Sequence, residues 1–245
     1  MIIKDVSLDT PEDNLLYDEA LLLLAERNNT EDILRFWEFS GPFVVLGKVS
    51  DEGKDVFINA CAEDKIPVLR RSSGGGTVIL GKGCLNYSLI LSKKRNPYLN
   101  NITRSYHEIL GKLIESFIKG GIGCGFFPTC DIVLLDGYKK FSGNAQKRGR
   151  DFVLHHGTVL YDFDLSLISK YLMIPEDQPQ YRNNRKHEDF VANISLPIWQ
   201  IKEIFISAFG AKEFSDITEQ ELSYLDYLKR VKAEKELAFS ESSFA

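Results

Sequence analysis

The sequence of 245 residues predicts an α+β fold. Apolar runs of strand length are joined by short turns in several places, which is typical of antiparallel hairpins. Helical patterns stand between groups of strands instead of following every strand, so a repeated βαβ arrangement is not indicated. With 44% apolar and 27% charged residues, the chain has the composition of an ordinary globular protein.

The first two thirds of the chain contain two long predicted helices and most of the strands. Thr10 followed by Pro11 marks a helix start, and we expect this helix to reach about residue 26. A second helix is expected over 101–119, where apolar residues recur on one stripe and Gly120 follows. Asp136-Gly137 predicts the turn of a hairpin. Strands are expected over 34–37, 42–46, 68–71, 77–80, 87–91, 131–135, from 140 onward and over 153–161.

Three further helices are expected after these strands. Asp164, Ser195 and Thr218 are candidate N-caps because their side chains accept hydrogen bonds from the first turn of a helix. The run from Thr218 to Glu221 has the capping-box pattern. The last two of these helices account for residues 196–245, each with an apolar stripe.

Charge and cysteine usage limit the classes of function. A net charge of −5, from 30 Lys and Arg against 35 Asp and Glu, disfavours a nucleic-acid binder. No apolar run approaches the roughly 20 residues that a membrane helix needs, and no secretory signal opens the sequence. The four cysteines form no C-x-x-C pair, and no Cys/His spacing indicates zinc. We therefore expect a cytoplasmic protein that binds neither nucleic acid nor membrane, with local basic clusters suited to a small anion.

Three consecutive glycines, Gly74 to Gly76, follow the strand that ends near Arg71. Such a run costs chain entropy, so some feature of the fold must require it. One interpretation is a loop whose N–H groups cradle an anion, with Arg71 adding a forked contact to phosphate or carboxylate. The other is a tight bend between two strands, and spacing alone does not separate them. The pattern matches neither G-x-x-x-x-G-K-[ST] nor G-x-G-x-x-G, so those two nucleotide-binding loops are not indicated.

Lys140 follows the predicted hairpin turn. Alternation places Phe141 in the core and Lys140 and Ser142 on the opposite face. A lysine on that face suits a carboxylate or an acyl phosphate, although most lysines on strands are simply solvated. The same alternation points His155 and His156 to opposite faces of their strand, and neither is expected to act as a base.

Five segments together resemble the lipoate–protein ligase family, within the superfamily of biotin and lipoate ligases and lipoyl or octanoyl transferases. In order they are Arg70-Arg71-Ser72-Ser73-Gly74-Gly75-Gly76-Thr77-Val78, Asn86-Tyr87-Ser88, Asp131-Ile132-Val133, Lys140-Phe141-Ser142-Gly143-Asn144-Ala145 and His155-His156-Gly157-Thr158-Val159-Leu160. The resemblance implies mixed, largely antiparallel sheets flanked by helices, with the active site in a cleft between two small sheets. It also implies a catalytic domain over 1–195 and a C-terminal helical extension of it over 196–245, with no separate accessory domain.

The resemblance further implies a two-step reaction that uses ATP and Mg²⁺. Lipoate and ATP form lipoyl-AMP and pyrophosphate, and a lysine of a small lipoyl carrier domain then takes the lipoyl group. The expected carrier belongs to a glycine-cleavage protein or to a 2-oxoacid dehydrogenase subunit. Because residues 196–245 are too few for the accessory domain of many bacterial ligases, a separate accessory subunit is a possible partner.

Carried over residue by residue, the resemblance gives Lys140 the central role. Lys140 would hold the lipoate carboxylate and then stabilise the charge that develops on the acyl phosphate. ATP would contact Arg71, Gly76, Thr77, Val78, Ile79, Asp131 and Lys140. Lipoate would contact Ser73, Gly75, Lys140, Ala145 and His156. Asp131 would also help to place Mg²⁺.

An ATP-independent octanoyl or lipoyl transferase is the alternative, with Cys124 as the thioester nucleophile. The stretch Cys124-Gly125-Phe126-Phe127-Pro128-Thr129 resembles the Cys-x-x-x-Pro-Ser stretch of one transferase branch. Cys124 would then lie exposed in a glycine-flanked loop, with its pKa lowered by Lys140. The intact glycine triplet favours the ligase. Two departures from the ligase pattern remain, because Leu80 replaces a frequent histidine and Cys130 a frequent asparagine.

A non-enzymatic lipoate sensor and a biotin ligase are further alternatives. The retention of Arg71, Lys140 and all three glycines argues against the sensor, and the segments around Lys140 and His155 fit lipoate better than biotin. The basic and aromatic loop over 179–193 is either a polar connection or, through Arg182 and Arg185, a cover for the nucleotide or a contact with the carrier.

Overall fold

The computed structural model describes the backbone of residues 1–242 and the side chains of residues 1–234. Its larger sheet is built from β1 (Ile2–Asp5), β2 (Ile33–Trp37), β6 (Cys84–Ser92), β7 (Cys124–Phe127), β8 (Asp131–Leu134), β9 (Lys139–Arg148), β10 (Phe152–Leu160) and β11 (Glu213–Phe214). These strands lie in the order β11-β1-β2-β6-β10-β9-β8-β7. β1 pairs in parallel with β2 and β11, and the other pairs are antiparallel.

A second sheet of three strands lies apart from the first. It contains β3 (Phe43–Leu46), β4 (Val68–Arg70) and β5 (Val78–Leu80), in the order β4-β3-β5. β3 pairs in parallel with β4 and antiparallel with β5. The predicted α+β class with mixed, largely antiparallel sheets is therefore confirmed, although the two sheets are unequal in size.

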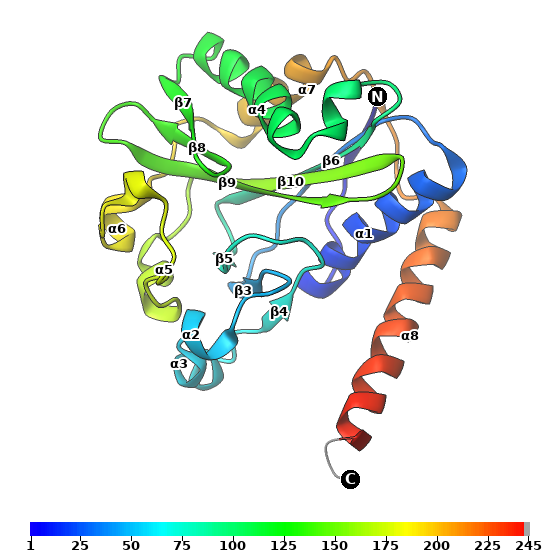
Figure 1. Cartoon of the computed structure of the whole chain (residues 1–245), viewed down its shortest axis with the longest axis horizontal. Coiled ribbons are helices and arrows are strands. Elements are labelled where there is room, and N and C mark those ends of the chain that lie inside the picture. The colour runs from blue at the N-terminus through cyan, green and yellow to red at the C-terminus, as the bar shows by residue number, and fades with distance from the viewer. Residues whose placement is uncertain (243–245) are drawn as a thin grey trace.

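Helices cover both faces of the larger sheet. The helices of the described residues are α1 (Pro11–Asn28), α2 (Glu52–Asp55), α3 (Ile58–Glu63), α4 (Ile102–Lys119), α5 (Ser166–Tyr171), α6 (His187–Phe190), α7 (Ile198–Phe209) and α8 (Glu219–Ser242), with 3-10 turns at Pro97–Asn100 and Gln180–Arg182. In Figure 1, α4 and α7 lie on one face of the larger sheet, and α1, α5, α6 and the three-stranded sheet lie on the other. α8 packs on α1 and then extends away from the body.

Local capping explains where the long helices begin. The Thr10 side chain accepts a hydrogen bond from Asp13 N at the start of α1. Asn101 accepts one from Arg104 N at the start of α4. At α8, Glu221 N donates to Thr218 Oγ1 and Thr218 N donates to Glu221 Oε2, which confirms the predicted capping box.

Ser195 is not a cap, and the prediction for it is wrong. Helix α7 begins at Ile198 after Pro197, whose extended backbone is the N-cap. Pro is favourable at a helix start because its missing N–H has no partner there. The N-cap of α5 is Leu165, one residue after the predicted Asp164, although the Asp164 side chain does accept hydrogen bonds from the Ser166 backbone and hydroxyl.

Six short strands and helices escaped prediction from the sequence, namely β1, β7, β11, α2, α3 and α6. Each is six residues long or shorter. β7 is held by its register with β8, which pairs Cys124 with Leu134 and Phe127 with Asp131. Such elements depend on tertiary pairing more than on local pattern.

Three apolar clusters hold the layers together, and one of them packs α1 and α8 on the larger sheet through Tyr17, Phe152 and Leu225. Another lies under α4 and α7 and includes Phe36, Tyr87, Phe117, Phe141 and Phe205. The third joins the three-stranded sheet to the larger sheet and α5, and includes Trp37, Val44, Ile79, Leu160 and Phe163. No helix among the described residues is long and apolar enough to cross a membrane.

A buried ion pair fixes α1 on the sheet. Arg35 of β2 is fully buried and lies 2.6 Å from Asp18 of α1. Ser88 of β6 donates to the other Asp18 oxygen at 2.7 Å, and Arg35 also donates to Asn14 Oδ1 at 2.6 Å. Because every charge here has several partners, loss of one member would leave an uncompensated buried charge, which costs about 3–5 kcal/mol.

Candidate active site

The glycine-rich segment is the loop between β4 and β5. It leans on the turn after β3, where Lys48 N donates to Ser73 O at 2.8 Å. Within the triplet, Gly75 has a positive φ of 88°, a conformation that side chains disfavour. Contact is also close at Gly47, where an added Cβ would lie 1.9 Å from Gly75 O. The loop is therefore a tight bend whose path requires glycine at Gly75 and at the facing Gly47.

Arg71 holds the loop from inside. Its Nη2 donates to Gly74 O and Gly76 O at 2.8 Å each, and its Nε donates to Ser73 Oγ at 3.0 Å. Burial lowers the pKa of Arg71 to about 10, so the side chain stays charged at neutral pH. In this structure the Arg71 guanidinium donates to carbonyls of its own loop. A forked contact with a phosphate would require the guanidinium to give up some of these hydrogen bonds.

The loop meets the larger sheet at Ser73. Ser73 Oγ lies 2.6 Å from His156 Nε2 of β10. Beside this contact, an added Cβ on Gly75 would lie 3.6 Å from the Ala145 side chain of β9. The structure therefore brings four of the predicted lipoate-binding residues together, with Ser73 and Gly75 on one side and Ala145 and His156 on the other.

His155 and His156 point to opposite faces, as predicted. His155 is fully buried on the α4 side, where its ring packs near Tyr106 and Tyr87. Burial lowers the pKa of each histidine to about 3, and for His156 the positive charge of Arg71 adds to the effect. Both rings are therefore neutral at physiological pH, and with pKa values this low they are weak proton acceptors.

Lys140 lies at the start of β9 and forms an ion pair across to β8. Its Nζ is 2.8 Å from Asp131 Oδ1, and the Asp131 side chain is nearly buried. The side chain runs flat over Gly143, where an added Cβ would lie 2.7 Å from Lys140 Nζ. Behind it, Ala192 N donates to Lys140 O at 3.0 Å. The lysine is thus partly exposed but held on three sides.

Ser142 does not share the face of Lys140, which corrects the prediction from simple alternation. The register between β8 and β9 shifts between Ile132 and Val133 because β9 carries a bulge there. Phe141 enters the core as expected. Ser142, however, lies within 3.4 Å of Asn144 Nδ2, on the buried side of the strand.

Cys130 lies beside Asp131 and is hydrogen-bonded to Asn144 of β9. Its thiol donates to Asn144 O at 2.6 Å, and the Asn144 amide returns a bond to Cys130 O at 2.7 Å. Burial and the Asp131 charge raise the pKa of the Cys130 thiol, whereas the charges of Lys140 and Arg71 lower it in part. Lys140 and Arg71 are therefore both near enough to Cys130 for their charges to act on its thiol.

The predicted nucleotide-binding residues from Gly76 to Ile79 differ in how exposed they are. Gly76 is exposed, and Thr77 Oγ1 donates to Asp55 Oδ2 of α2 at 2.5 Å. Val78 is half-buried. Ile79 is buried in the apolar cluster of the three-stranded sheet, so it would meet a nucleotide through its backbone alone.

Cys124 is neither exposed nor in a loop, so that expectation is wrong. It lies at the start of β7 and is 2% exposed, within the apolar cluster under α4. Burial raises the pKa of its thiol to about 12, and no lowering by Lys140 accompanies it. Gly123 and Gly125 suggested a loop, but the pairing of β7 with β8 decides the local structure.

Tyr181 is a residue of the site that the sequence did not single out. Its hydroxyl donates to Asp131 Oδ2 at 2.6 Å. The neighbouring Arg185 donates to Gly137 O, Tyr138 O and Tyr181 O, so it braces the β8–β9 turn from the loop. Arg182 is buried and donates to Arg185 O. The two arginines therefore hold the loop itself, and a pattern of basic residues alone could not reveal this.

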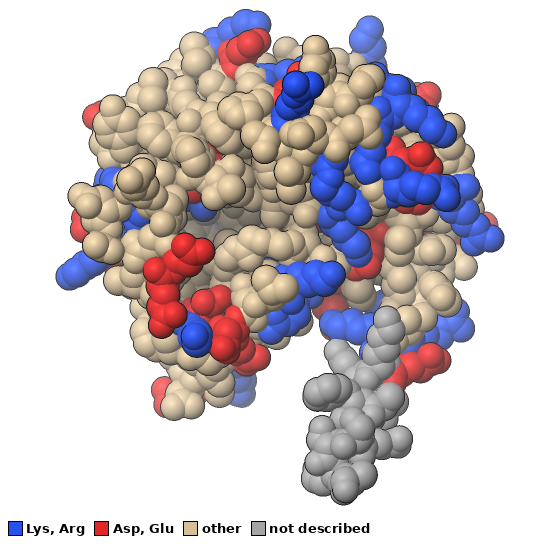
Figure 2. All heavy atoms as spheres, viewed as in Figure 1, with Lys and Arg blue, Asp and Glu red and all other residues tan. Residues whose placement is uncertain are grey.

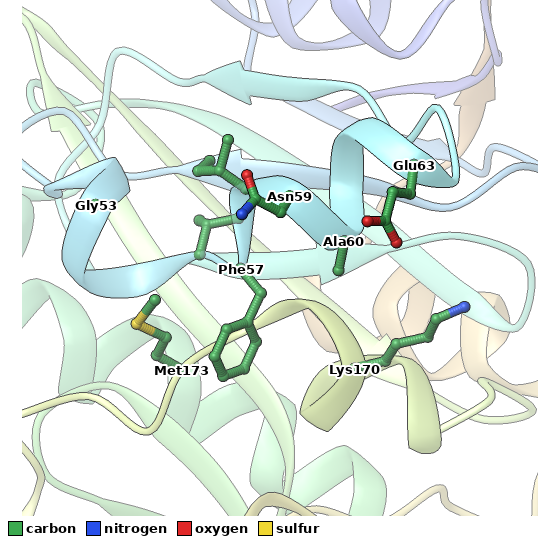
Figure 3. A pocket seen from close by; sticks show the side chains of 9 residues that line it. Gly53, Phe57, Asn59, Ala60, Glu63, Lys170 and Met173 are labelled. Atoms are coloured by element: carbon green, nitrogen blue, oxygen red, sulfur yellow. The ribbon is translucent and has the colours of Figure 1, made fainter.

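A hollow of about 580 Å³ lies elsewhere, between α2, α3 and the end of α5. Figure 3 shows Phe57, Asn59, Glu63, Lys170 and Met173 around it. None of the predicted site residues lines this hollow. Figure 2 shows acidic side chains gathered at the lower left of the visible face and most basic side chains toward the right of the same face. Lys170 on the rim of the hollow is already paired with Asp64 at 2.7 Å, so we place the candidate site at Lys140 and the glycine-rich loop.

Within the described residues, no group of three or more His, Cys, Asp or Glu side chains is arranged to hold a metal ion. Asp131 can supply a single carboxylate, and its two oxygens keep lone pairs beyond those used by Lys140 and Tyr181. A magnesium ion that arrives with a nucleotide needs few protein ligands because phosphates and water complete its shell. Asp131 therefore suits the role of a single protein ligand to a magnesium ion that is otherwise held by phosphates and water.

The sequence has curated relatives of two enzyme kinds. A probable lipoate-protein ligase A of Mycoplasma pneumoniae is 29% identical over 78% of this chain and 56% of its own length. The octanoyltransferase LipM of Geobacillus kaustophilus is 24% identical over 92% of both chains. An inactive lipoate–protein ligase 2 of Plasmodium falciparum is 31% identical over 62% of this chain and 47% of its own. The chain spans about half the length of these two ligases.

Two solved structures share the fold. A chain from a bi-partite lipoate protein ligase system of Thermoplasma acidophilum, described with its E2 lipoyl domain, superposes with a TM-score of 0.77. It is 22% identical, and the match covers 93% of this chain and 90% of that one. A lipoate-protein ligase A bound with ATP gives 0.78 at 23% identity, with 92% of each chain covered. At these identities the likeness concerns the fold.

The family match covers most of the chain and includes every residue of the candidate site. Residues 10–210 match the lipoyl protein ligase A/B catalytic domain. The glycine-rich loop, Lys140 and the segment around His156 all fall inside this range, and the loop meets His156 in the structure. Sequence and geometry thus agree that the chain belongs to the lipoyl protein ligase A/B catalytic domain family.

Proposed function

We propose that this protein is an ATP-dependent lipoate–protein ligase. The observation that carries the proposal is the ion pair of Lys140 with Asp131 at the start of β9, together with the glycine-rich loop that meets Ala145 of β9 and His156 of β10. A lysine suits a substrate carboxylate and an arginine suits a nucleotide phosphate. The intact triplet and the ATP-bound structural neighbour support the choice of a nucleotide-dependent reaction.

In the first step, a lipoate carboxylate oxygen attacks the α-phosphorus of ATP and pyrophosphate leaves. Lys140 Nζ orients the carboxylate and then stabilises the negative charge that develops on the transferring group. Arg71, Gly76, Thr77, Val78 and the Ile79 backbone would line the nucleotide, and Asp131 would take its place beside the phosphates. A magnesium ion bound with ATP would supply charge neutralisation there.

In the second step, the amine of a carrier lysine attacks the lipoyl carbonyl and AMP leaves. The chain needs no nucleophile of its own, because the carrier supplies it. Ser73, Gly75, Ala145 and His156 would border the acyl chain and exclude water, which would otherwise hydrolyse the mixed anhydride. The neutral state of His156 suits an apolar chain better than an imidazolium would.

The carrier that we propose is a lipoyl domain, of a glycine-cleavage protein or a 2-oxoacid dehydrogenase subunit. The bi-partite structural neighbour was described with an E2 lipoyl domain, which supports a carrier of this class and makes a separate accessory subunit a sensible partner to test. We further propose that residues 1–195 form the catalytic domain and 196–245 its helical extension. The four free cysteines favour a cytoplasmic setting.

An octanoyl or lipoyl transferase is the second candidate function. LipM of Geobacillus kaustophilus aligns over 92% of both chains, which favours this reading. The burial of Cys124 opposes it, because the attacking species in such a transfer is an accessible thiolate. The transferase reading would need β7 to open or another thiol to act.

One experiment separates the two functions. The protein is incubated with a lipoyl domain and either lipoate with MgATP or an octanoyl thioester of an acyl carrier, and the mass of the domain is measured. The ligase proposal expects a lipoyl adduct with lipoate and MgATP and none with the thioester alone. Adduct from the thioester without ATP would replace the ligase by the transferase.

A further inference from the structure

The Asp131 carboxylate is gripped from two sides. Lys140 Nζ lies 2.8 Å from Oδ1, and the Tyr181 hydroxyl donates to Oδ2 at 2.6 Å. Burial and the neighbouring Asp131 charge raise the pKa of Tyr181 well above its ordinary value, so the phenol keeps its proton and acts as a donor. Asp131 is thus held between the cation of β9 and a phenol that arrives from the loop after α5.

Tyr181 is itself firmly placed. Its ring packs between Phe127 of β7 and Phe190 of α6, at centroid distances of 5.0 and 5.2 Å. Arg185 donates to Tyr181 O and also to two carbonyls of the β8–β9 turn, so hydrogen bonds tie the loop to the hairpin. A residue anchored in this way can fix the orientation of a partner that has little freedom of its own.

We infer that Tyr181 is a positioning residue of the candidate active site, which acts through Asp131 to set how Lys140 meets a substrate carboxylate. This inference rests on the proposed function. The Tyr181 hydroxyl donates to one Asp131 oxygen and thereby draws charge density from the carboxylate. Lys140 is then held in place but is not so tightly paired that it cannot turn to a second carboxylate.

Without the Tyr181 hydroxyl, the Asp131 carboxylate keeps its ion pair with Lys140 but loses the hydrogen bond to its other oxygen. The carboxylate is then free to rotate about its side-chain bond. The ion pair then competes more strongly with the incoming lipoate for the same ammonium group. A hydrogen bond to a charged group makes a modest but measurable contribution, so we expect lipoate to bind about fivefold more weakly to Tyr181→Phe. The phenyl ring keeps the contacts with Phe127 and Phe190, so folding is preserved.

The test is a double-mutant cycle read by equilibrium binding of lipoate in titration calorimetry, without ATP or carrier. The proteins are wild type, Tyr181→Phe, Asp131→Asn and the double variant, with thermal unfolding to verify the fold of each. Tyr138→Phe is the matched control, because Tyr138 also touches the Phe127 ring but is exposed. We expect the loss of about fivefold in the wild-type background and a loss below about twofold in the Asp131→Asn background.

Each other outcome has a definite meaning. Unchanged lipoate affinity in Tyr181→Phe overturns the inference and leaves the proposed function intact. An equal loss in both backgrounds also overturns it, because Tyr181 would then act by packing and not through Asp131. If the wild type binds lipoate at no accessible concentration, the proposed function fails and the inference fails with it, and the wild-type titration alone distinguishes this case from the other two.

Discussion

The Ser73 hydroxyl lies 2.6 Å from Nε2 of His156, and this contact joins the glycine-rich loop to the larger sheet. Arg71 Nε donates to Ser73 Oγ, which leaves the Ser73 proton to be donated to the neutral imidazole. Arg71, Ser73 and His156 therefore form a hydrogen-bonded chain from the three-stranded sheet to β10. The two walls of the proposed lipoate site are set by this chain.

Replacement of Ser73 by alanine should break the chain at its centre. The buried His156 nitrogen then loses its partner and Arg71 loses one acceptor, at a cost of about 1–2 kcal/mol. We expect kcat/KM for lipoyl-AMP formation to fall about 5- to 30-fold. Ser72→Ala is the control, and an equal effect of both variants would mean that the contact with His156 has no special part.

The pH dependence of stability follows from the two histidines of β10. Burial lowers both pKa values from about 6.5 to about 3, so the unfolded chain binds more protons than the folded one between these limits. The free energy of unfolding therefore falls as pH drops through this window, by at most about 1.4 kcal/mol per pH unit for each histidine.

Urea unfolding at pH 7.5, 6.5 and 5.5 measures this slope. His155→Gln should reduce the slope, because one protonation site with a lowered pKa is removed, whereas His156 and His187, whose pKa burial also lowers, remain. His107→Gln, at an exposed position of α4, controls for the loss of an imidazole as such. A slope that His155→Gln leaves unchanged would contradict the burial of a neutral His155.

The Lys140 side chain passes directly over Gly143, where the absence of a Cβ leaves room for it. A Cβ added there would lie 2.7 Å from Lys140 Nζ and 2.8 Å from its Cε, so the lysine must move. Misplacement of a reacting group by about 1 Å costs up to roughly 100-fold in rate, so we expect Gly143→Ala to lower kcat/KM about 10- to 100-fold.

Thermal unfolding and adenylation rates of Gly143→Ala provide the measurement. Gly111→Ala is the matched control, since an added Cβ there meets nothing within 4 Å and alanine stabilises a helix interior by about 0.5–1 kcal/mol. Full activity of Gly143→Ala would show that the observed path of Lys140 is unimportant for the reaction.

The thiols of Cys124 and Cys130 should differ in their reactivity toward an alkylating agent. Cys124 is buried with a pKa raised to about 12, whereas Cys130 is half-buried at the edge of the site. We expect iodoacetamide at pH 8 to modify Cys130 at least about tenfold faster than Cys124 in the native protein, because alkylation needs an accessible thiolate. Peptide mass spectrometry over time measures both rates. Faster modification of Cys124 would revive it as a nucleophile.

Much of this fold was predictable because its long elements carry strong local signals. The cap of α1 and the capping box of α8 are read directly from Thr10 and Thr218, and α4 is read from its apolar stripe and the Gly120 that follows it. β1, β7 and α2 carry no such signal, since their four-residue lengths leave pairing and packing to decide. Cys124 illustrates the difference, because its glycine neighbours indicate a loop until β8 pairs with it.

The candidate site was predictable in its residue types and less so in its contacts. Arg71, Lys140 and Asp131 were found from the sequence, but Arg71 turned out to bind the carbonyls of its own loop. The bulge in β9 moved Ser142 to the other face, and no alternation pattern reveals a bulge in advance. Tyr181 was missed because the residue that it contacts lies 50 positions away in sequence.

The most direct test of the ligase account is pyrophosphate release from lipoate and MgATP in the absence of any carrier. Lys140→Ala removes the proposed carboxylate-binding group, and Lys139→Ala removes its neighbour, to which no role is assigned. The account predicts release by wild type, Lys139→Ala and Cys124→Ala, with a loss of at least about 100-fold in Lys140→Ala. Release by Lys140→Ala at the wild-type rate would contradict the central claim.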